Sequence, residues 1–300
     1  MPENDKKTNS FNMKEIVDDL CRPESYNKVF LRPKDHEIHM PSVEELKQAV
    51  ELLRSVLFPG YYLHSEVREE TMDYYIGATL DKCYSILTEQ LKRGYCFACG
   101  AGSFCSVCES NSINAVQKLF GRLSYIRHML ATDAEAAYEG DPAARSIGEA
   151  IFSYPSVRAL TNHRIAHELY RLDVPIIPRL ISEMAHSEAG IDIHPGAEIG
   201  ERFFLDHGTG TVIGETAIIG NNVRIYQGVT LGAKSFPKDE DGNPIKGVPR
   251  HPLVEDNVII YAGATVLGRV TIGEGAEIGG NVWITRDVPS GERVLQRRAD

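Results

Sequence analysis

The sequence has no excess of positive charge and no long apolar run. Its 42 acidic and 32 basic side chains give a net charge of −10 at pH 7. A balance of this sign gives no general attraction to nucleic acid or to anionic membranes. No segment approaches the roughly 18 apolar residues that a membrane-spanning helix needs. The composition therefore favours neither a nucleic-acid-binding protein nor a membrane protein.

The first residues lack the apolar stretch of a secretory signal. The chain opens with the polar run MPENDKKTNS, so we expect the protein to stay in the cytoplasm, where it is made. Because that compartment is reducing, its six cysteines are expected to be thiols or metal ligands and not disulfides.

Residues 1–190 are predicted to form a helical domain. Ser42-Val43-Glu44-Glu45 is a capping box ahead of apolar residues spaced three and four apart, and Pro59-Gly60 ends that helix. Further apolar stripes predict helices over 72–91, 113–130, 156–172 and 177–189. Residues 1–40, with scattered charge, are expected to be loosely ordered or to wrap another subunit.

After Gly190 the apolar residues recur every six positions. The series runs through Ile193, Ile199, Leu205, Ile213, Ile219, Ile225, Leu231, Val254, Ile260, Val266, Ile272, Ile278 and Ile284, with a two-residue shift after Leu205. Neither a helix nor an amphipathic strand has this period. A triangular solenoid does, because each hexapeptide forms one short strand and a corner. The sequence thus predicts an α+β chain whose residues 191–300 form a left-handed parallel β-helix.

Residues 233–252 do not follow the period and are rich in Gly, Pro, Lys and Asp. Because regular coils flank them, we expect these residues to be extruded as a loop. Loops of this length in compact domains are usually functional.

Polar residues break the solenoid pattern in two places. His207 follows Asp192 by fifteen residues, and Arg250-His251 stands at the exit of the loop. In an eighteen-residue coil, residues fifteen apart lie on neighbouring coils, so Asp192 or Asp206 is placed to orient the His207 imidazole. A histidine oriented by a carboxylate can take the proton of a hydroxyl at neutral pH. Exposed corner residues without any function remain the alternative.

These stretches resemble the serine acetyltransferases. The resemblance rests on DIHPGAEIG, LDHGTGTVIGETAIIG, QGVTLG, RHP and the final hexapeptides, and more weakly on SVRALTNHRIAHELY and LFPGYY. The last of these is typical of the longer branch of the family. The resemblance implies transfer of an acetyl group from acetyl-CoA to the L-serine hydroxyl, giving O-acetylserine for cysteine biosynthesis.

The resemblance also implies a role for each matching residue. His207 corresponds to the general base and Asp192 to its carboxylate partner. The residues that match those around serine are Asp141 and Asp206 on its ammonium side, and Arg250 and His251 at its carboxylate. The small residues that match the lining of the acetyl-CoA groove are Ala233, Ala262 and Gly280.

Three other functions remain open at this point. One is acetylation of a sugar or antibiotic hydroxyl. A sugar has no charged ends, however, and would not need the ion-pairing residues Asp141, Arg250 and His251. Another is a zinc-dependent carbonic anhydrase on the same solenoid, with His194, His207 and His251 as ligands. The last is a scaffold without catalysis, which the presence of His207 and of the residues matched to serine binding disfavours.

Homo-oligomers are expected, because a short solenoid leaves apolar side surface that a trimer would cover. By resemblance, the helical halves then pair two trimers. Many relatives dock a terminal Ile into O-acetylserine sulfhydrylase, but this chain ends in Arg297-Arg298-Ala299-Asp300. Burying an unpaired carboxylate costs several kcal/mol, so we expect no tail-mediated cysteine synthase complex.

Two CxxC pairs lie within residues 96–108. Cys96 and Cys99 form the first pair, and Cys105 and Cys108 the second. Four such thiols suit tetrahedral Zn²⁺, and an iron–sulfur cluster uses the same ligands. A redox-responsive dithiol pair and four unrelated thiols are the remaining interpretations, and the family resemblance supports none of them.

Overall fold

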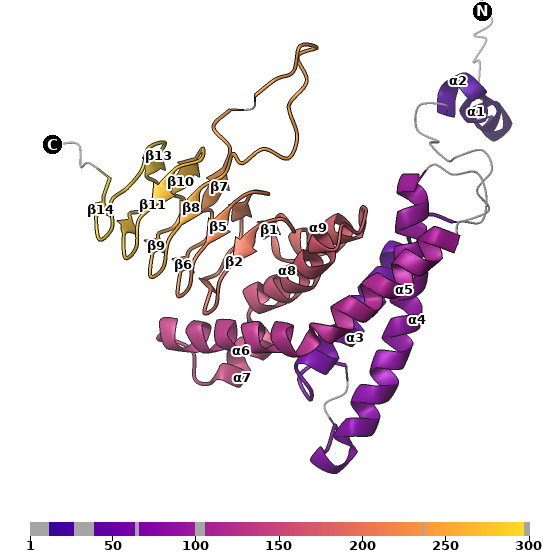
Figure 1. Cartoon of the computed structure of the whole chain (residues 1–300), viewed down its shortest axis with the longest axis horizontal. Helices are drawn as coiled ribbons and strands as arrows, with labels where there is room; N and C mark the ends of the chain where they lie inside the picture. Colours follow the sequence, from indigo (N-terminus) through magenta and orange to yellow (C-terminus); the bar gives the residue numbers. More distant parts are fainter. Residues whose placement is uncertain (1–11, 27–38, 64–65, 100–105, 236, 297–300) are drawn as a thin grey trace, which may run out of the picture.

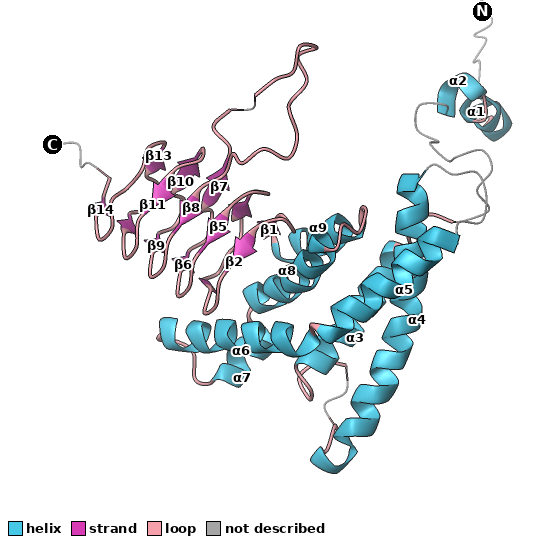
Figure 2. Cartoon of the chain, viewed as in Figure 1, coloured by secondary structure: helices cyan, strands magenta, loops and turns pink. Residues whose placement is uncertain are grey.

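The structure is a computed structural model of the 300-residue chain. It describes residues 12–26, 39–63, 66–99, 106–235 and 237–296 (Figure 1). Helices make up the N-terminal part and short strands the C-terminal part (Figure 2). Among the described helices, none combines the length and the apolar character that a membrane crossing requires.

The helices run in chain order up to residue 189. They are α1 (Met13–Leu20), α2 (Pro23–Tyr26), α3 (Val43–Leu57), α4 (Met72–Cys99), α5 (Ser106–Gly121), α6 (Leu123–Gly140), α7 (Ile147–Ser153), α8 (Pro155–Arg171) and α9 (Ile177–Ala189). The capping box is confirmed, because the Ser42 hydroxyl accepts from the Glu45 amide at 3.3 Å. The side chains of residues 12–25 are exposed in the single chain, so contact of this segment with another subunit stays a prediction.

Two helix predictions are wrong in their extent. The helix that was predicted over 72–91 continues to Cys99, because Leu91 and Cys96 both still face the core. The single helix over 113–130 is two helices, α5 and α6, which meet at Arg122. The apolar stripe passes through that break because both helices bury one face in the same core. Periodicity alone therefore does not reveal the junction.

The strands stack in three parallel sheets, which we name A, B and C. Sheet A contains β1 (Asp192–Ile193), β4 (Val212–Ile213), β7 (Thr230–Gly232), β10 (Thr265–Leu267) and β13 (Trp283–Ile284). Sheet B contains β2 (Glu198–Ile199), β5 (Ile218–Ile219), β8 (Leu253–Val254) and β11 (Thr271–Ile272). Sheet C contains β3 (Phe204–Leu205), β6 (Arg224–Ile225), β9 (Ile259–Ile260), β12 (Glu277–Ile278) and β14 (Arg293–Val294).

From β1 to β13, successive strands along the chain belong to sheets A, B and C in turn, so the chain forms the triangular coil that the period of six predicts. Between β13 and β14, which belongs to sheet C, the sheet B position is an isolated bridge of Val288 to Ile272. The aliphatic residue of each hexapeptide points into the prism; Ile213, Ile260 and Val266, for example, are 1% exposed or less. Residues 233–252 leave the coil after β7 and return at β8, and Figure 1 shows them projecting beyond the stack of strands. We call the two corners that matter here C/A, between sheets C and A, and A/B, between sheets A and B.

A buried ion pair joins the helices to the first coil. Arg164 of α8 donates from Nη2 to Asp133 Oδ1 of α6 at 3.0 Å, and their side chains are 8% and 1% exposed. Arg164 also donates to the carbonyls of Ile199 at 2.5 Å and Gly200 at 2.7 Å. The Phe203 amide donates to Asp133 Oδ1 at 3.0 Å. Two helices and the corner between β2 and β3 are therefore held at one point.

We expect Asp133→Asn to destabilise the protein by about 3–5 kcal/mol, because it leaves the buried Arg164 charge without a counterion. Urea denaturation at pH 7 and fixed protein concentration measures this. The matched control is Glu139→Gln on the same helix, which removes an exposed ion pair with Arg202 and should change the free energy of unfolding by less than about 1 kcal/mol. Equal, small effects of both substitutions would contradict the role of the buried pair.

Candidate functional site

The first group of predicted site residues lies at the C/A corner of the first coil. Asp206 and His207 directly follow β3, and six residues (206–211) connect this strand to β4. The next coil turns the same corner with only residues 226–229. This difference is the two-residue shift seen in the sequence. The longer corner lets the chain bulge outward at His207.

His207 has an unusual backbone for a histidine. Its φ of +55° lies in the left-handed region, which costs a residue with a Cβ about 1–3 kcal/mol. Its side chain is 74% exposed, and its Nε2 lies 3.8 Å from Asp206 Oδ1. The imidazole is thus presented to solvent beside a carboxylate, where a substrate hydroxyl can reach it.

Asp141 joins this group from the end of α6. Gly140 brings the helix end against the β-helix, because a Cβ there would come within 2.6 Å of the Phe204 ring. The Tyr154 hydroxyl donates to Asp141 Oδ2 at 2.5 Å, and the Ala143 amide donates to Oδ1 at 2.8 Å. These two hydrogen bonds, and secondarily the nearby His207, lower the pKa of the Asp141 carboxyl below its usual value. Asp141 is therefore an anion that faces the His207 corner.

The second carboxylate of this corner behaves in the opposite way. Burial raises the pKa of Asp206, and the nearby Asp141 charge adds to the rise, while His207 opposes it. Two carboxylates thus share the corner with one imidazole. Such a site is suited to hold a cationic group next to a hydroxyl.

Arg250 and His251 lie at the A/B corner, at the point where the long loop rejoins the coil. Arg250 Nη2 donates to Glu215 Oε2 at 2.5 Å, and Tyr170 donates to the other oxygen of Glu215 at 3.0 Å. Arg250 is held in place by this pair and keeps further N–H groups for a ligand. Its fork suits a carboxylate.

His251 is a neutral imidazole with a defined tautomer. Burial, followed by the charge of Arg250, lowers its pKa to about 4. Its Nδ1 accepts from the Thr216 amide at 3.0 Å, so the proton sits on Nε2. The ring lies against Gly214, where a Cβ would come within 2.2 Å of Nε2. His251 therefore offers one N–H donor beside the Arg250 guanidinium.

The two groups are not brought together within one chain. The C/A corner precedes the strands of sheet A and the A/B corner follows them, so the two groups lie at opposite ends of these strands. One face of the prism has about five residues at ~3.3 Å per residue and therefore spans roughly 15 Å. Among the described residues, no hydrogen bond or ion pair links Arg250 or His251 to His207. A single small substrate cannot contact both groups of one copy.

Asp192 begins β1, on the outer side of sheet A. Its carboxylate lies with Glu183 and His186 of α9, and the ligand atoms of the three are all within 4.8 Å of one another. No hydrogen bond between Asp192 and His207 is present in the described part of the chain. The pairing of these two residues stays a prediction.

The predicted cofactor residues are also divided between corners. Ala262 and Gly280 follow β9 and β12 at the C/A corner, on neighbouring coils above His207. A Cβ at Gly280 would lie 3.2 Å from the Ala262 carbonyl, so the backbone is closely packed there. Ala233 follows β7 at the A/B corner. Their role in binding a cofactor stays a prediction.

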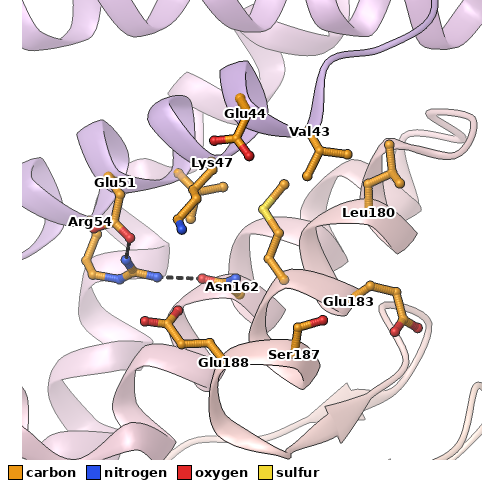
Figure 3. A pocket seen from close by; sticks show the side chains of 12 residues that line it. Val43, Glu44, Lys47, Glu51, Arg54, Asn162, Leu180, Glu183, Ser187 and Glu188 are labelled. Carbon is orange, nitrogen blue, oxygen red and sulfur yellow. Dashed lines mark hydrogen bonds and ion pairs between the residues drawn. The ribbon is translucent and has the colours of Figure 1, made fainter.

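A separate cavity of about 480 Å³ lies between α3 and α9. Figure 3 shows Glu44, Lys47, Glu51, Arg54 and Glu188 around it. Arg54 donates hydrogen bonds to Glu51 and to Asn162. Glu51 forms ion pairs with both Arg54 and Arg158, and the cavity holds none of the predicted catalytic or binding residues. The predicted site residues lie instead at the two corners of sheet A and at the start of β1.

Three of the four cysteines in the predicted metal site are described and lie close together. The thiols of Cys96, Cys99 and Cys108 are all within 4.8 Å of one another. Cys105 lies outside the described residues.

Residues that support the site were missed by the sequence reasoning. Tyr154 holds Asp141, while Glu215 and Tyr170 hold Arg250. Glu215 stands inside the quoted motif LDHGTGTVIGETAIIG, which is the one signal that the sequence offered. The two tyrosines reach the site by tertiary packing and had none.

A solenoid of hexapeptide coils with an exposed histidine beside carboxylates is the arrangement expected of a hexapeptide-repeat acyltransferase. In agreement, residues 251–286 match the family described as bacterial transferase hexapeptide (six repeats). Among curated proteins, the chain is 52% identical over 261 residues to a plasmid-encoded serine acetyltransferase of Synechococcus elongatus, covering 86% of this chain and 82% of the relative. The chain belongs to the serine acetyltransferase family.

Other relatives agree with this assignment. A serine acetyltransferase of Bacillus subtilis is 46% identical over 167 residues, which cover 56% of this chain and 73% of the relative. The crystal structure of Entamoeba histolytica isoform 3 in complex with cysteine superposes with a TM-score of 0.73 at 34% identity, covering 92% of this chain and 90% of that one.

The Neisseria gonorrhoeae serine acetyltransferase in complex with serine gives a TM-score of 0.55 at 26% identity, covering 89% of this chain and all of that one. The prediction of a helical region followed by a left-handed parallel β-helix is confirmed. So is the prediction of an acyltransferase, and the scaffold and carbonic anhydrase interpretations fall away.

Because the Tyr154 hydrogen bond is the main cause of the low pKa of Asp141, Tyr154→Phe should raise that pKa toward the ordinary aspartate value. Carbon-detected NMR titration of the carboxyl measures the shift. Tyr138→Phe changes an exposed tyrosine of α6 and should leave the titration unchanged. An identical Asp141 titration in Tyr154→Phe and the wild type would contradict the assignment.

Proposed function

We propose that the protein transfers the acetyl group of acetyl-CoA to the hydroxyl of L-serine, giving O-acetylserine and free CoA. The observation that supports this most is the C/A corner, where the exposed His207 stands beside Asp206 and Asp141. Solved serine acetyltransferase structures in complex with cysteine and with serine add to the support.

The chemistry needs one group that moves a proton. His207 takes the proton of the serine hydroxyl while the oxygen attacks the thioester carbonyl carbon, and a tetrahedral oxyanion forms. When the carbon–sulfur bond breaks, the same imidazolium returns the proton to the departing thiolate. Alignment of two bound substrates removes much of the entropic barrier of their encounter. In this scheme Asp192 or Asp206 stabilises the imidazolium while it carries the charge.

Serine is held by its two charged ends. Asp141 and Asp206 face its ammonium group, while Arg250 and the Nε2–H of His251 face its carboxylate. The two pairs lie at different corners of one chain, whereas serine is too short to bridge a face of the prism. We therefore propose that serine binds between two copies, one contributing Asp141, Asp206 and His207, and the other contributing Arg250 and His251.

Such an arrangement requires a cyclic oligomer. In a trimer, each copy presents its C/A corner to one neighbour and its A/B corner to the other, so three equivalent sites close the ring. Pairing of two such trimers through the helical domains remains our expectation for the whole assembly. Acetyl-CoA would then run along the same groove, past Ala262 and Gly280 on one side and Ala233 on the other. Small side chains there let the pantetheine arm approach the backbone, whose N–H groups can stabilise the oxyanion.

Two earlier expectations remain proposals. The cytoplasmic location is one of them. Another is the absence of a tail-mediated complex with O-acetylserine sulfhydrylase, because residues 297–300, on which it rests, lie outside the described part of the chain.

His207→Ala should lower kcat for serine acetylation by about 10²–10⁴, the range that a general base contributes. A thiol-release assay with serine and acetyl-CoA measures the rate, and circular dichroism confirms the fold. His128→Ala is the matched control, because His128 is also exposed but lies on α6 and pairs with Glu201. Near-normal turnover of a folded His207→Ala protein would refute the proposed base.

The divided site has its own test, in which two impaired variants rescue each other. Arg250→Ala should raise the Michaelis constant for serine, because it removes a contact that is already present in the bound ground state. A 1:1 mixed oligomer of His207→Ala and Arg250→Ala copies should regain up to about a quarter of wild-type activity at low serine, since one interface in four carries neither substitution.

The control is a mixed oligomer of His207→Ala with Asp206→Ala. Both substitutions fall on the same corner, so no interface is spared at His207 and Asp206 together and activity should stay low. If the His207→Ala and Arg250→Ala copies assemble but do not regain activity, the two corners of one copy serve the same site and the division is wrong.

A further inference from the structure

Two helices bring three cysteines together at a place that the proposed catalysis does not use. Cys96 and Cys99 lie in the last turn of α4, and Cys108 lies in the first turn of α5. Their three Sγ atoms are within 4.8 Å of one another. Cys96 and Cys108 are buried, whereas Cys99 is exposed. Figure 1 shows the ends of α4 and α5 that carry them well apart from the strands of the β-helix.

We propose that Cys96, Cys99 and Cys108 bind one Zn²⁺ ion. In a tetrahedral site with Zn–S bonds of about 2.3 Å, neighbouring sulfur atoms lie about 3.8 Å apart. The separations in the structure are at most 4.8 Å, so shifts of about 1 Å or less in the Sγ positions bring them to this value. In an iron–sulfur cluster, thiolates that bind different irons are held farther apart, so the close approach of all three favours a single ion. A water molecule can fill the fourth coordination position from solvent, because Cys99 is exposed.

The surroundings favour the thiolate form that zinc requires. Cys108 stands in the first turn of a 16-residue helix, where the partial positive charge of the helix N-terminus stabilises an anion. On binding, each coordinating thiol releases its proton to solvent and its sulfur donates a lone pair to the ion, with no change of oxidation state. No oxidant or further reactant is needed.

The ion would fix a hairpin on which the helical domain depends. α4 contributes Leu87 and Leu91 to the core, and α5 contributes Val116 and Leu119. A metal bridge between Cys99 and Cys108 closes a short loop and thereby restricts the unfolded chain. Its role is therefore structural, and the acetyl transfer at the C/A corner does not pass through it.

Metal analysis of the full-length protein tests the proposal directly. Protein purified with a thiol reductant and without chelator should contain about one zinc per chain by inductively coupled plasma mass spectrometry. Cys99→Ser should lose at least tenfold in zinc affinity, measured by competition with a chromogenic chelator. Cys99 is exposed, so this change leaves the packing intact. Cys21→Ser, which alters another exposed cysteine, should keep the wild-type zinc.

Two further measurements use the wild type without any substitution. Replacement of zinc by Co²⁺ should produce an intense sulfur-to-cobalt charge-transfer band, as thiolate ligation requires. Removal of zinc by chelation should lower the midpoint of thermal unfolding by about 5 °C or more, while kcat at 25 °C stays the same. This last readout separates failure of the zinc site from failure of the proposed catalysis.

Several results would overturn the proposal. Wild-type protein without zinc that still does not bind added Zn²⁺ is one, and equal zinc affinity in Cys99→Ser and the wild type is another. Iron with acid-labile sulfide would instead establish a cluster. A disulfide between two of the three cysteines in protein that was purified without reductant and holds no zinc would instead establish a redox pair.

Discussion

The ion pair between Asp133 and Arg164 determines where the helical domain meets the β-helix. Its hydrogen bonds reach the carbonyls of Ile199 and Gly200 and the amide of Phe203, so the first coil is aligned on α6 and α8. The distance along α6 from Asp133 to its C-terminus then decides where Asp141 stands. A helix rises 1.5 Å per residue, so that eight-residue spacing carries the carboxylate about 12 Å, to the His207 corner. The geometry of the site is thus set by a contact that touches no substrate.

The β-helix itself contributes regularity, and the catalytic residue depends on a local departure from it. At every regular corner, equivalent residues of successive coils lie directly above one another, so each side chain there belongs to a stack. At residues 206–211 the two additional residues break this stacking and lift His207 out of it. Asn281 at the C/A corner and Asn222 at another also have a positive φ. The left-handed backbone is therefore an ordinary corner device, and the distinctive feature of His207 is its position in a longer corner.

The repeating part of the fold was the most predictable from the sequence. One constraint, an aliphatic residue that fills the prism, is repeated thirteen times in the series that begins at Ile193, and each repetition strengthens the same interpretation. The break at Arg122 was not predictable, because α5 and α6 share one apolar face. Single site residues were recognised from their motifs. The support of Asp141 by Tyr154 was not, since it arises from a contact between α6 and the start of α8. The division of the site between corners also depends on which sheet each residue follows, which a linear pattern does not show.

The long loop starts and ends at the same corner. Ala233 stands at its first stem and Arg250 at its second, and β7 and β8, from which the two stems leave, are consecutive strands of the same coil on adjacent faces of the prism. Because the stems are fixed by the coils, the number of residues between them has almost no influence on where Ala233 and Arg250 lie. Doubling such a loop costs only about 0.6 kcal/mol in closure entropy. Evolution can therefore lengthen, shorten or rewrite this segment freely, and relatives can acquire new surface there without disturbing either substrate.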